Sequence, residues 1–163
     1  MILRNKIIII VGIIVLAGGV YFVLPSEQKS TNTKINISSD GESDQVTMYK
    51  SPTCGCCVKH ASYVEDAGYE VDIIKESNMS SIKDKYNIPA DMESCHTSIY
   101  GDYIVEGHVP MEAINKMLTE KPDIDGIALP DMPAGSPGMP GTKVGKFTIY
   151  ALKDGVSSVY MKL

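Results

Sequence analysis

The chain is poor in arginine, cysteine and histidine. Its 163 residues include one arginine, Arg4, together with four cysteines and three histidines. After residue 24, 13 lysines stand against 20 acidic residues, a net charge of −7 with histidine neutral. This balance argues against nucleic acid or an anionic membrane surface as a partner. The sequence also has no internal repeat.

The composition is that of a globular protein, since 44% of the residues are hydrophobic and 21% are charged. The length suits one domain of ordinary size with a further segment attached. We therefore expect a single folded domain rather than a disordered chain.

The further segment is residues 1–24. Arg4 and Lys6 precede 18 uncharged residues, 7–24, a run longer than a usual signal-peptide core and at the lower edge of a membrane-spanning helix. Small residues at 16–19 leave cleavage open, but the apolar run continues to Leu24 and favours an uncleaved membrane anchor. The basic residues before the run place the rest of the protein outside the cytoplasm.

Residues 25–44 are rich in Ser, Thr, Asn, Asp and Lys and have no helical or strand period. They are interpreted as a flexible polar tether. The folded domain is then expected over residues 45–163.

Hydrophobic periodicity predicts the order β-α-β-α-β-β-α in this domain. The predicted strands are 45–50, 69–74, 97–100 and 103–106. The first predicted helix follows the cysteine-rich loop and ends at Gly68, the second covers 80–86, and the third begins at Pro110. A loop rich in Pro, Gly and Met fills 129–145, and 147–152 with 156–161 form a last hairpin.

Three cysteines, Cys54, Cys56 and Cys57, stand in the stretch SPTCGCCVKH at the expected start of the first helix. Free backbone N–H groups and the helix dipole favour thiolates there. The C-x-x-C spacing of Cys54 and Cys57 suits a thiol-disulfide oxidoreductase with Cys54 as the nucleophile. Two structural disulfides are a third hypothesis, which the crowded spacing disfavours.

A metal site uses all four cysteines, because Cys95 adds a fourth thiolate to the cluster. Copper(I) accepts two or three thiolates and tolerates bridging sulfurs, whereas structural zinc usually takes paired C-x-x-C turns. His60 shares a helix face with Cys56 and Cys57, and His96 adjoins Cys95. These neighbours favour one or two histidines as ligands. The loop methionines Met132 and Met139 are either weak ligands or loop anchors.

Four strings of residues resemble CopG-type copper-resistance proteins, exported metal-binding proteins long classed as a domain of unknown function. The strings are Ser51-Pro-Thr-Cys-Gly-Cys-Cys57, Ser94-Cys-His-Thr97, Tyr103-Ile-Val-Glu-Gly-His-Val-Pro110 and Leu129-Pro-Asp-Met-Pro with Gly135-Ser-Pro-Gly-Met139. The resemblance spans about residues 46–163. An N-terminal anchor would set this chain apart as a membrane-held version.

The resemblance implies a thioredoxin-like α/β fold that carries a multinuclear, cysteine-bridged copper(I) site. By position it implies the metal ligands Cys54, Cys56, Cys57, Cys95, His96 and His108 and leaves His60 unassigned. The implied roles are copper sequestration or copper redox exchange. We also expect that the protein could pass copper on to other copper-handling proteins. In a thioredoxin-like fold a proline preceding the third strand faces the C-x-x-C loop. Pro89 is the candidate for that position and for a cis peptide bond after Ile88.

Overall fold

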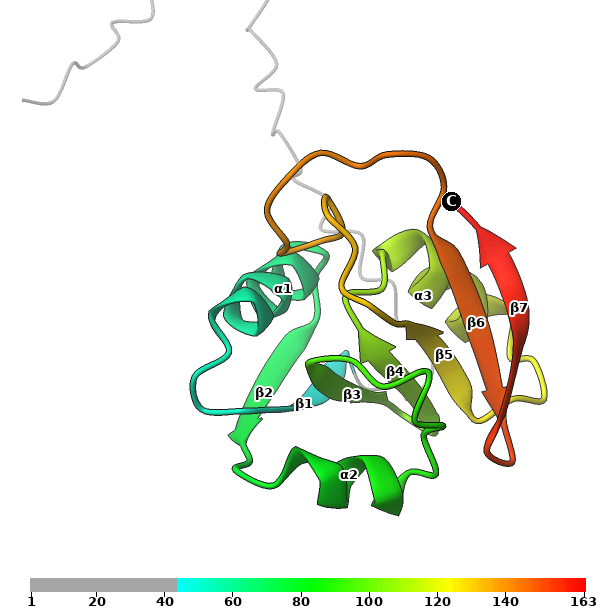
Figure 1. Ribbon diagram of the computed structural model, residues 1–163, viewed down its shortest axis with the longest axis horizontal. Coiled ribbons are helices and arrows are strands. Elements are labelled where there is room, and N and C mark those ends of the chain that lie inside the picture. The colour runs from blue at the N-terminus through cyan, green and yellow to red at the C-terminus, as the bar shows by residue number, and fades with distance from the viewer. Residues whose placement is uncertain (1–43) are drawn as a thin grey trace, which may run out of the picture. The chain divides into compact units, whose positions relative to one another are not determined.

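The protein forms one mixed α/β sheet with three helices, as seen in a computed structural model that describes residues 44–163 (Figure 1). Within that range the sheet has seven strands in the order β2-β1-β3-β4-β5-β6-β7. The strands are β1 (Gln45–Lys50), β2 (Glu70–Lys75), β3 (His96–Tyr100), β4 (Tyr103–Gly107), β5 (Gly126–Leu129), β6 (Thr148–Lys153) and β7 (Val156–Lys162), and the helices are α1 (Gly55–Asp66), α2 (Met79–Lys85) and α3 (Met111–Glu120).

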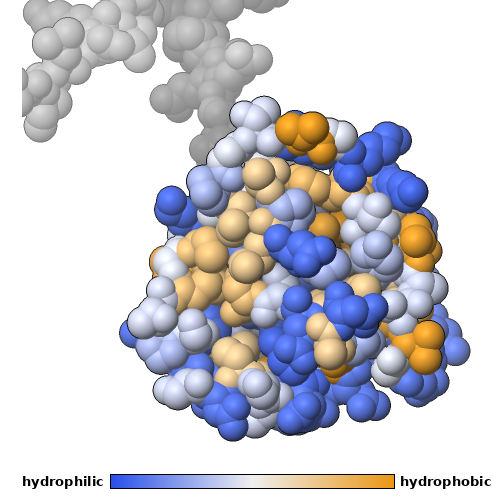
Figure 2. All heavy atoms as spheres, viewed as in Figure 1, coloured by the Kyte–Doolittle hydropathy of each residue, from blue (hydrophilic) through white to orange (hydrophobic). Residues whose placement is uncertain are grey.

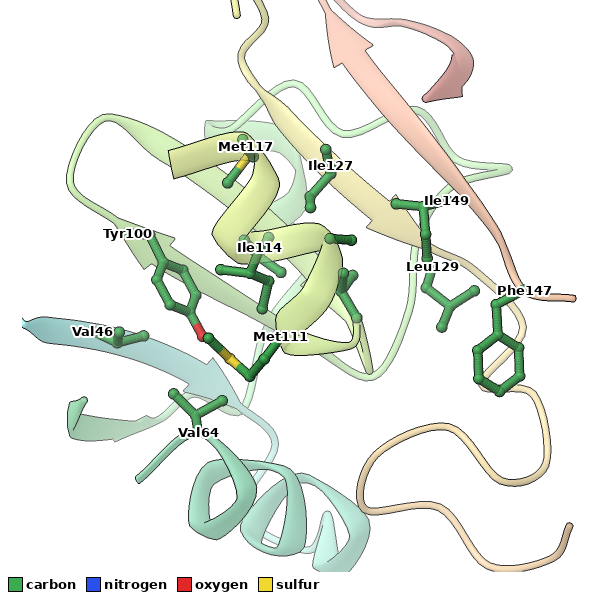
Figure 3. Close-up of a cluster of buried hydrophobic side chains, with 13 residues drawn as sticks. Val46, Val64, Tyr100, Met111, Ile114, Met117, Ile127, Leu129, Phe147 and Ile149 are labelled. Atoms are coloured by element: carbon green, nitrogen blue, oxygen red, sulfur yellow. The ribbon is translucent and has the colours of Figure 1, made fainter. Parts of the chain in front are cut away.

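Helices α1 and α3 cover one face of the sheet. Val64 of α1 and Ile114 of α3 (Figure 3) belong to one buried cluster with side chains from five strands. Val105 of β4 is also a member of this cluster. Ile104, the neighbour of Val105 on β4, belongs instead to a second cluster with Ile88 and residues near α2. Because adjacent strand residues point to opposite faces, the two clusters lie on the two sides of the sheet.

The strand pairing follows from the connections. The β1–β2 and β4–β5 pairs are parallel, and a helix joins each pair, α1 in the first case and α3 in the second. The remaining pairs are antiparallel. This confirms the predicted order β-α-β-α-β-β-α and the C-terminal hairpin, and it adds β5, which the sequence pattern missed.

Two further expectations need correction. No peptide bond in residues 44–163 is cis, so the cis bond expected between Ile88 and Pro89 is wrong. Helix α2 also begins one residue earlier than expected, because the Asn78 side chain accepts the Ser81 N–H at the helix start.

A long connection between β5 and β6, residues 130–147, passes back over the start of α1 (Figure 1); we call it the capping loop. Gly138 makes the close approach. A Cβ at this position would lie 2.7 Å from the backbone nitrogen of His60 and 2.9 Å from the carbonyl oxygen of Cys56. The absence of a side chain at Gly138 therefore lets the loop pack directly on the first turns of α1.

No helix in the described part of the chain is long and apolar enough to cross a membrane. The predicted anchor at residues 7–24 and almost all of the tether at 25–44 lie outside the described residues. Within the described residues the first element is β1, and the expected division into anchor, tether and domain stays a prediction.

Candidate metal centre

The strand register explains why distant site residues meet. Lys50, the last residue of β1, pairs with His96, the first residue of β3, and Thr97 pairs with Glu106 near the end of β4. The loop after β1, the segment before β3 and the segment after β4 therefore meet at the same end of these neighbouring strands. Together with the first turn of α1 and the first residue of β3, these segments carry all six residues expected to bind metal.

Cys54 is the N-cap of α1. Its sulfur accepts the backbone N–H of Cys57 at 3.2 Å, and it stands 3.5 Å from the sulfur of Cys56. The three cysteines therefore occupy the first turn, where unpaired N–H groups and the helix dipole stabilise negative charge on sulfur.

A disulfide joins Cys54 and Cys57, and Cys56 and Cys95 are free thiols. The disulfide uses the C-x-x-C pair that the sequence marked as a redox dithiol. Cys57 is fully buried, whereas Cys54 is partly exposed. The structure therefore presents the cysteine cluster in its oxidised form.

Cys95 links the cysteines to the histidines. Its sulfur lies 2.9 Å from Nε2 of His108 and 3.4 Å from Nδ1 of His96, and its carbonyl oxygen lies 3.8 Å from the sulfur of Cys57. Among residues 44–163, potential ligand atoms form two overlapping groups, each with all atoms within 4.8 Å of one another. The groups are Cys54, Cys56, Cys57 and Cys95, and Cys57, Cys95, His96 and His108.

His60 also lies beside these residues, although the sequence motifs assign it no role. It is 1% exposed, and its ring centre lies 4.8 Å from that of His96 and 5.0 Å from that of His108. All three histidines of the chain therefore lie together. Helical spacing from Cys56 and Cys57 was the available signal, but it could not show that β3 and β4 bring the other two histidines to the same place.

The capping loop fixes the proton positions on two rings. The carbonyl oxygen of Pro137 accepts hydrogen bonds from Nδ1 of His108 at 2.6 Å and from Nδ1 of His60 at 3.1 Å. A carbonyl only accepts, so both Nδ1 atoms carry hydrogen and each Nε2 keeps its lone pair in the neutral ring. This is the arrangement in which an Nε2 atom can bind a metal, with an outer partner holding the ring.

His96 supplies a direct test of whether the site suits a metal. Its Nε2 atom is buried and has no hydrogen-bond partner among residues 44–163. A buried nitrogen without a partner carries an uncompensated desolvation cost. A cation at this position would satisfy it, and thiolate sulfur with imidazole nitrogen is a donor set that suits copper.

Burial sets the protonation of the cluster. Burial and then the nearby His108 lower the pKa of His60 to about 4, and burial also lowers the pKa values of His96 and His108. Burial and then Cys56 raise the pKa of the Cys95 thiol to about 12. At neutral pH the histidines are therefore neutral donors, and Cys95 keeps its proton until a cation displaces it.

The two loop methionines are less informative. Met132 is 38% exposed, with φ at 44°, and Met139 is half-buried in the capping loop. In Figure 2 moderately hydrophobic residues gather on the face that carries the start of α1 and the capping loop. The roles of the two methionines as ligands or anchors stay predictions.

Comparison with known proteins gives a consistent result. Two solved structures of the copper resistance protein CopG, described as Form 2 and Form 1, match with a TM-score of 0.67 and 36% sequence identity. Each match covers 73% of this chain, and 97% and 96% of the CopG chains. The chain belongs to the CopG family of copper resistance proteins. A family model described as a protein of unknown function, DUF411, matches residues 92–139, which include Cys95, His96 and His108. No curated protein matches.

Proposed function

We propose that the protein binds copper(I) outside the cytoplasm through a cluster of cysteine thiolates, and so buffers copper or passes it on to other copper-handling proteins. The observation that carries this proposal is the overlap of the two ligand groups at Cys57 and Cys95. A sulfur that belongs to both groups can bridge two ions. We therefore expect more than one copper(I) per chain.

The donor set favours copper over zinc. Four sulfurs and two imidazoles lie in overlapping groups rather than in one closed tetrahedron. Copper(I) is soft and accepts low coordination with bridging thiolates, whereas structural zinc takes four ligands in one tetrahedral shell. In this proposal Cys54, Cys56, Cys57 and Cys95 hold the metal, and His96 and His108 complete or shield the site.

Binding requires the reduced form of the protein. The Cys54–Cys57 disulfide removes two of the four thiolates. A thiol reductant that delivers two electrons and two protons gives two thiols, and each thiol loses its proton when its sulfur binds copper. The matching CopG structures are named as copper resistance proteins, which supports copper as the metal.

The location and the fold assignment are part of the same proposal. The basic residues before the apolar run at 7–24 support an extracytoplasmic domain held by an N-terminal anchor. A C-x-x-C pair at the start of the helix after the first strand, within the order β-α-β-α-β-β-α, supports a thioredoxin-like core. The strongly acidic composition after residue 24 speaks against nucleic acid as a partner.

A second function is favoured by the disulfide itself. A C-x-x-C disulfide at a helix N-terminus, with a partly exposed Cys54 and a buried Cys57, suits a thiol-disulfide oxidoreductase. In that case a substrate thiolate attacks the Cys54 sulfur, forms a mixed disulfide and releases Cys57 as a thiolate. Cys56 and Cys95 have no place in this exchange, which is why we rank it second.

Native mass spectrometry of the described domain tests the proposal. Anaerobically reduced protein titrated with copper(I) is expected to take up several ions and to show four free thiols when the metal is removed. Oxidised protein is expected to show two free thiols and to take up fewer ions. A reduced protein that remains free of copper at every ratio would refute the proposal and favour the oxidoreductase.

A further inference from the structure

A buried polar network lies against the sheet on the side opposite the histidines. Glu106 is fully buried and forms an ion pair with Lys83 of α2, which is 2% exposed. Thr97 donates from its hydroxyl to Oε2 of Glu106 at 2.7 Å and accepts from the Lys83 ammonium at 2.9 Å. Thr97 is the neighbour of His96 on β3, so the two side chains point to opposite faces of the sheet.

The network reaches the metal centre through one backbone group. The N–H of Ser94 donates to Oε1 of Glu106 at 2.6 Å. Ser94 directly precedes Cys95, whose sulfur lies 2.9 Å from Nε2 of His108. The carboxylate on one side of the sheet therefore holds the segment that presents Cys95 on the other side.

Gly107, the last residue of β4, lies in close contact with Ser94. A Cβ at this position would lie 2.5 Å from the Ser94 hydroxyl oxygen and 2.6 Å from the Leu129 carbonyl oxygen. Ser94 is thus pressed against the end of β4 while its N–H is bound by Glu106. Two independent contacts fix the position of this residue.

Stability alone does not account for a buried ion pair. Burying two charges costs hydration free energy that is about as large as the free energy of their attraction. A protein with apolar side chains of the same volume at these positions is therefore often as stable. What a carboxylate provides that an apolar side chain cannot is a fixed acceptor for a particular N–H group. Here that group is the amide of Ser94.

We propose that Glu106, held in place by Lys83, is a positioning residue that fixes the Ser94–Cys95 backbone and so aims the Cys95 sulfur at the metal cluster. This inference rests on the copper-binding function proposed above. It adds two side chains that are not themselves ligands and that come from the far side of the sheet.

The test compares two double variants that both remove the buried charges. The first, Lys83→Met with Glu106→Gln, keeps a carbonyl acceptor for the Ser94 N–H and is called the Gln variant. The second, Lys83→Met with Glu106→Leu, removes that acceptor and is called the Leu variant. Neither leaves a single unpaired charge behind, so the two differ in whether residue 106 still offers a polar group to the Ser94 N–H and, next to it, to the Thr97 hydroxyl. The control is Lys116→Met with Glu120→Leu, which removes an ion pair on the exposed surface of α3.

Two measurements are made on each variant. Copper(I) affinity of the reduced protein is measured by competition with a chelator. Iodoacetamide labelling of the oxidised protein is followed at Cys56 and Cys95, the two free thiols, by peptide mass spectrometry. The Leu variant is expected to lose about 10- to 100-fold in copper affinity, the usual effect of removing an outer partner, and its Cys95 is expected to label faster relative to Cys56. The Gln variant is expected to recover most of both properties, and the surface variant to match the unmodified protein.

Equal copper affinity and equal Cys95 labelling in the Leu variant and the unmodified protein would overturn the inference. So would a Gln variant as impaired as the Leu variant, because the charges rather than the Ser94 bond would then matter.

If the Leu variant does not fold, hydrogen exchange of the Ser94 amide in the unmodified protein decides: slow exchange supports the inference, and exchange at the rate of an exposed loop overturns it. Failure of the unmodified protein to bind copper would refute the proposed function alone, since labelling and exchange need no metal.

Discussion

The sulfur of Cys95 lies 2.9 Å from Nε2 of His108, although 13 positions separate the two residues in the chain. The β3–β4 hairpin brings them together, because the residues before β3 and after β4 meet at its open end. The same contact connects the cysteine-rich helix start with the three buried histidines. Metal binding in this protein therefore depends on a hairpin as much as on the C-x-C-C motif.

Loss of the His108 ring is expected to weaken copper binding more than loss of the His60 ring. Both rings donate to the Pro137 carbonyl, but only His108 also contacts the Cys95 sulfur. We expect His108→Gln to lower copper(I) affinity at least about tenfold, the lower end for loss of even an outer partner. Chelator competition checks this, with His60→Gln as the matched variant. Equal losses in the two variants would contradict the assigned difference.

The close packing of Gly138 predicts a measurable cost for a side chain there. Gly138→Ala places a Cβ against His60 and Cys56 at a φ of 84°, so overpacking adds to backbone strain, each about 1 to 3 kcal/mol. Gly145→Ala is the control, because its φ of 72° is similar and nothing lies within 4 Å of its Cβ. Urea unfolding should show a larger loss for Gly138→Ala. Equal losses would mean that the capping loop does not press on α1.

The metal-free protein is expected to lose stability in mild acid. Burial, and to a smaller extent the nearby His108, lowers the pKa of His60 from 6.5 to about 4. Between pH 6.5 and pH 4 the unfolded chain therefore binds a proton that the folded protein does not. The free energy of unfolding therefore falls as the pH drops through this window, by about 3 kcal/mol for a shift of this size. The lowered pKa values of His96 and His108 act in the same direction.

Urea unfolding of metal-free protein across this pH window checks the effect. His60→Gln removes the titrating group, so its free energy of unfolding should fall less steeply between neutral pH and pH 4. Parallel curves for the variant and the unmodified protein would show that His60 is not held neutral by burial.

Cysteine variants separate the two proposed functions. If the protein binds copper, Cys56→Ser should lose most copper, because Cys56 belongs to the four-sulfur group. If the protein exchanges disulfides, Cys56→Ser should keep insulin-reduction activity while Cys54→Ser abolishes it. Measuring copper content and insulin reduction on both variants decides between them, since the disulfide joins Cys54 to Cys57 and leaves Cys56 outside.

Local signals were sufficient for the helix start and the hairpin. The three cysteines precede a helical period, and the strands of the β3–β4 hairpin flank a Gly101-Asp102 turn, so both elements could be predicted from short-range spacing. The strand β5 was missed because Gly126–Leu129 has four residues, all buried, and no alternation to detect. Its glycine is required by packing, since a Cβ at Gly126 would lie 2.0 Å from the Ile104 carbonyl oxygen.

Contacts between distant segments could not be predicted in the same way. Glu106 looks like an ordinary strand residue in the sequence, and its partner Lys83 stands 23 positions earlier on another element. The role of Pro137 is likewise invisible, because a backbone carbonyl leaves no signature in side-chain chemistry. Such groups are found only when the fold shows which side of the sheet each segment reaches.

Anaerobic competition for copper(I) between the fully reduced protein and a strong chelator decides whether the cysteine cluster binds this metal. We expect the unmodified reduced protein to withdraw more than one copper(I) per chain, and the oxidised protein, with Cys54 and Cys57 joined, to withdraw far less. A reduced protein that withdraws no copper(I) from the chelator would contradict this expectation.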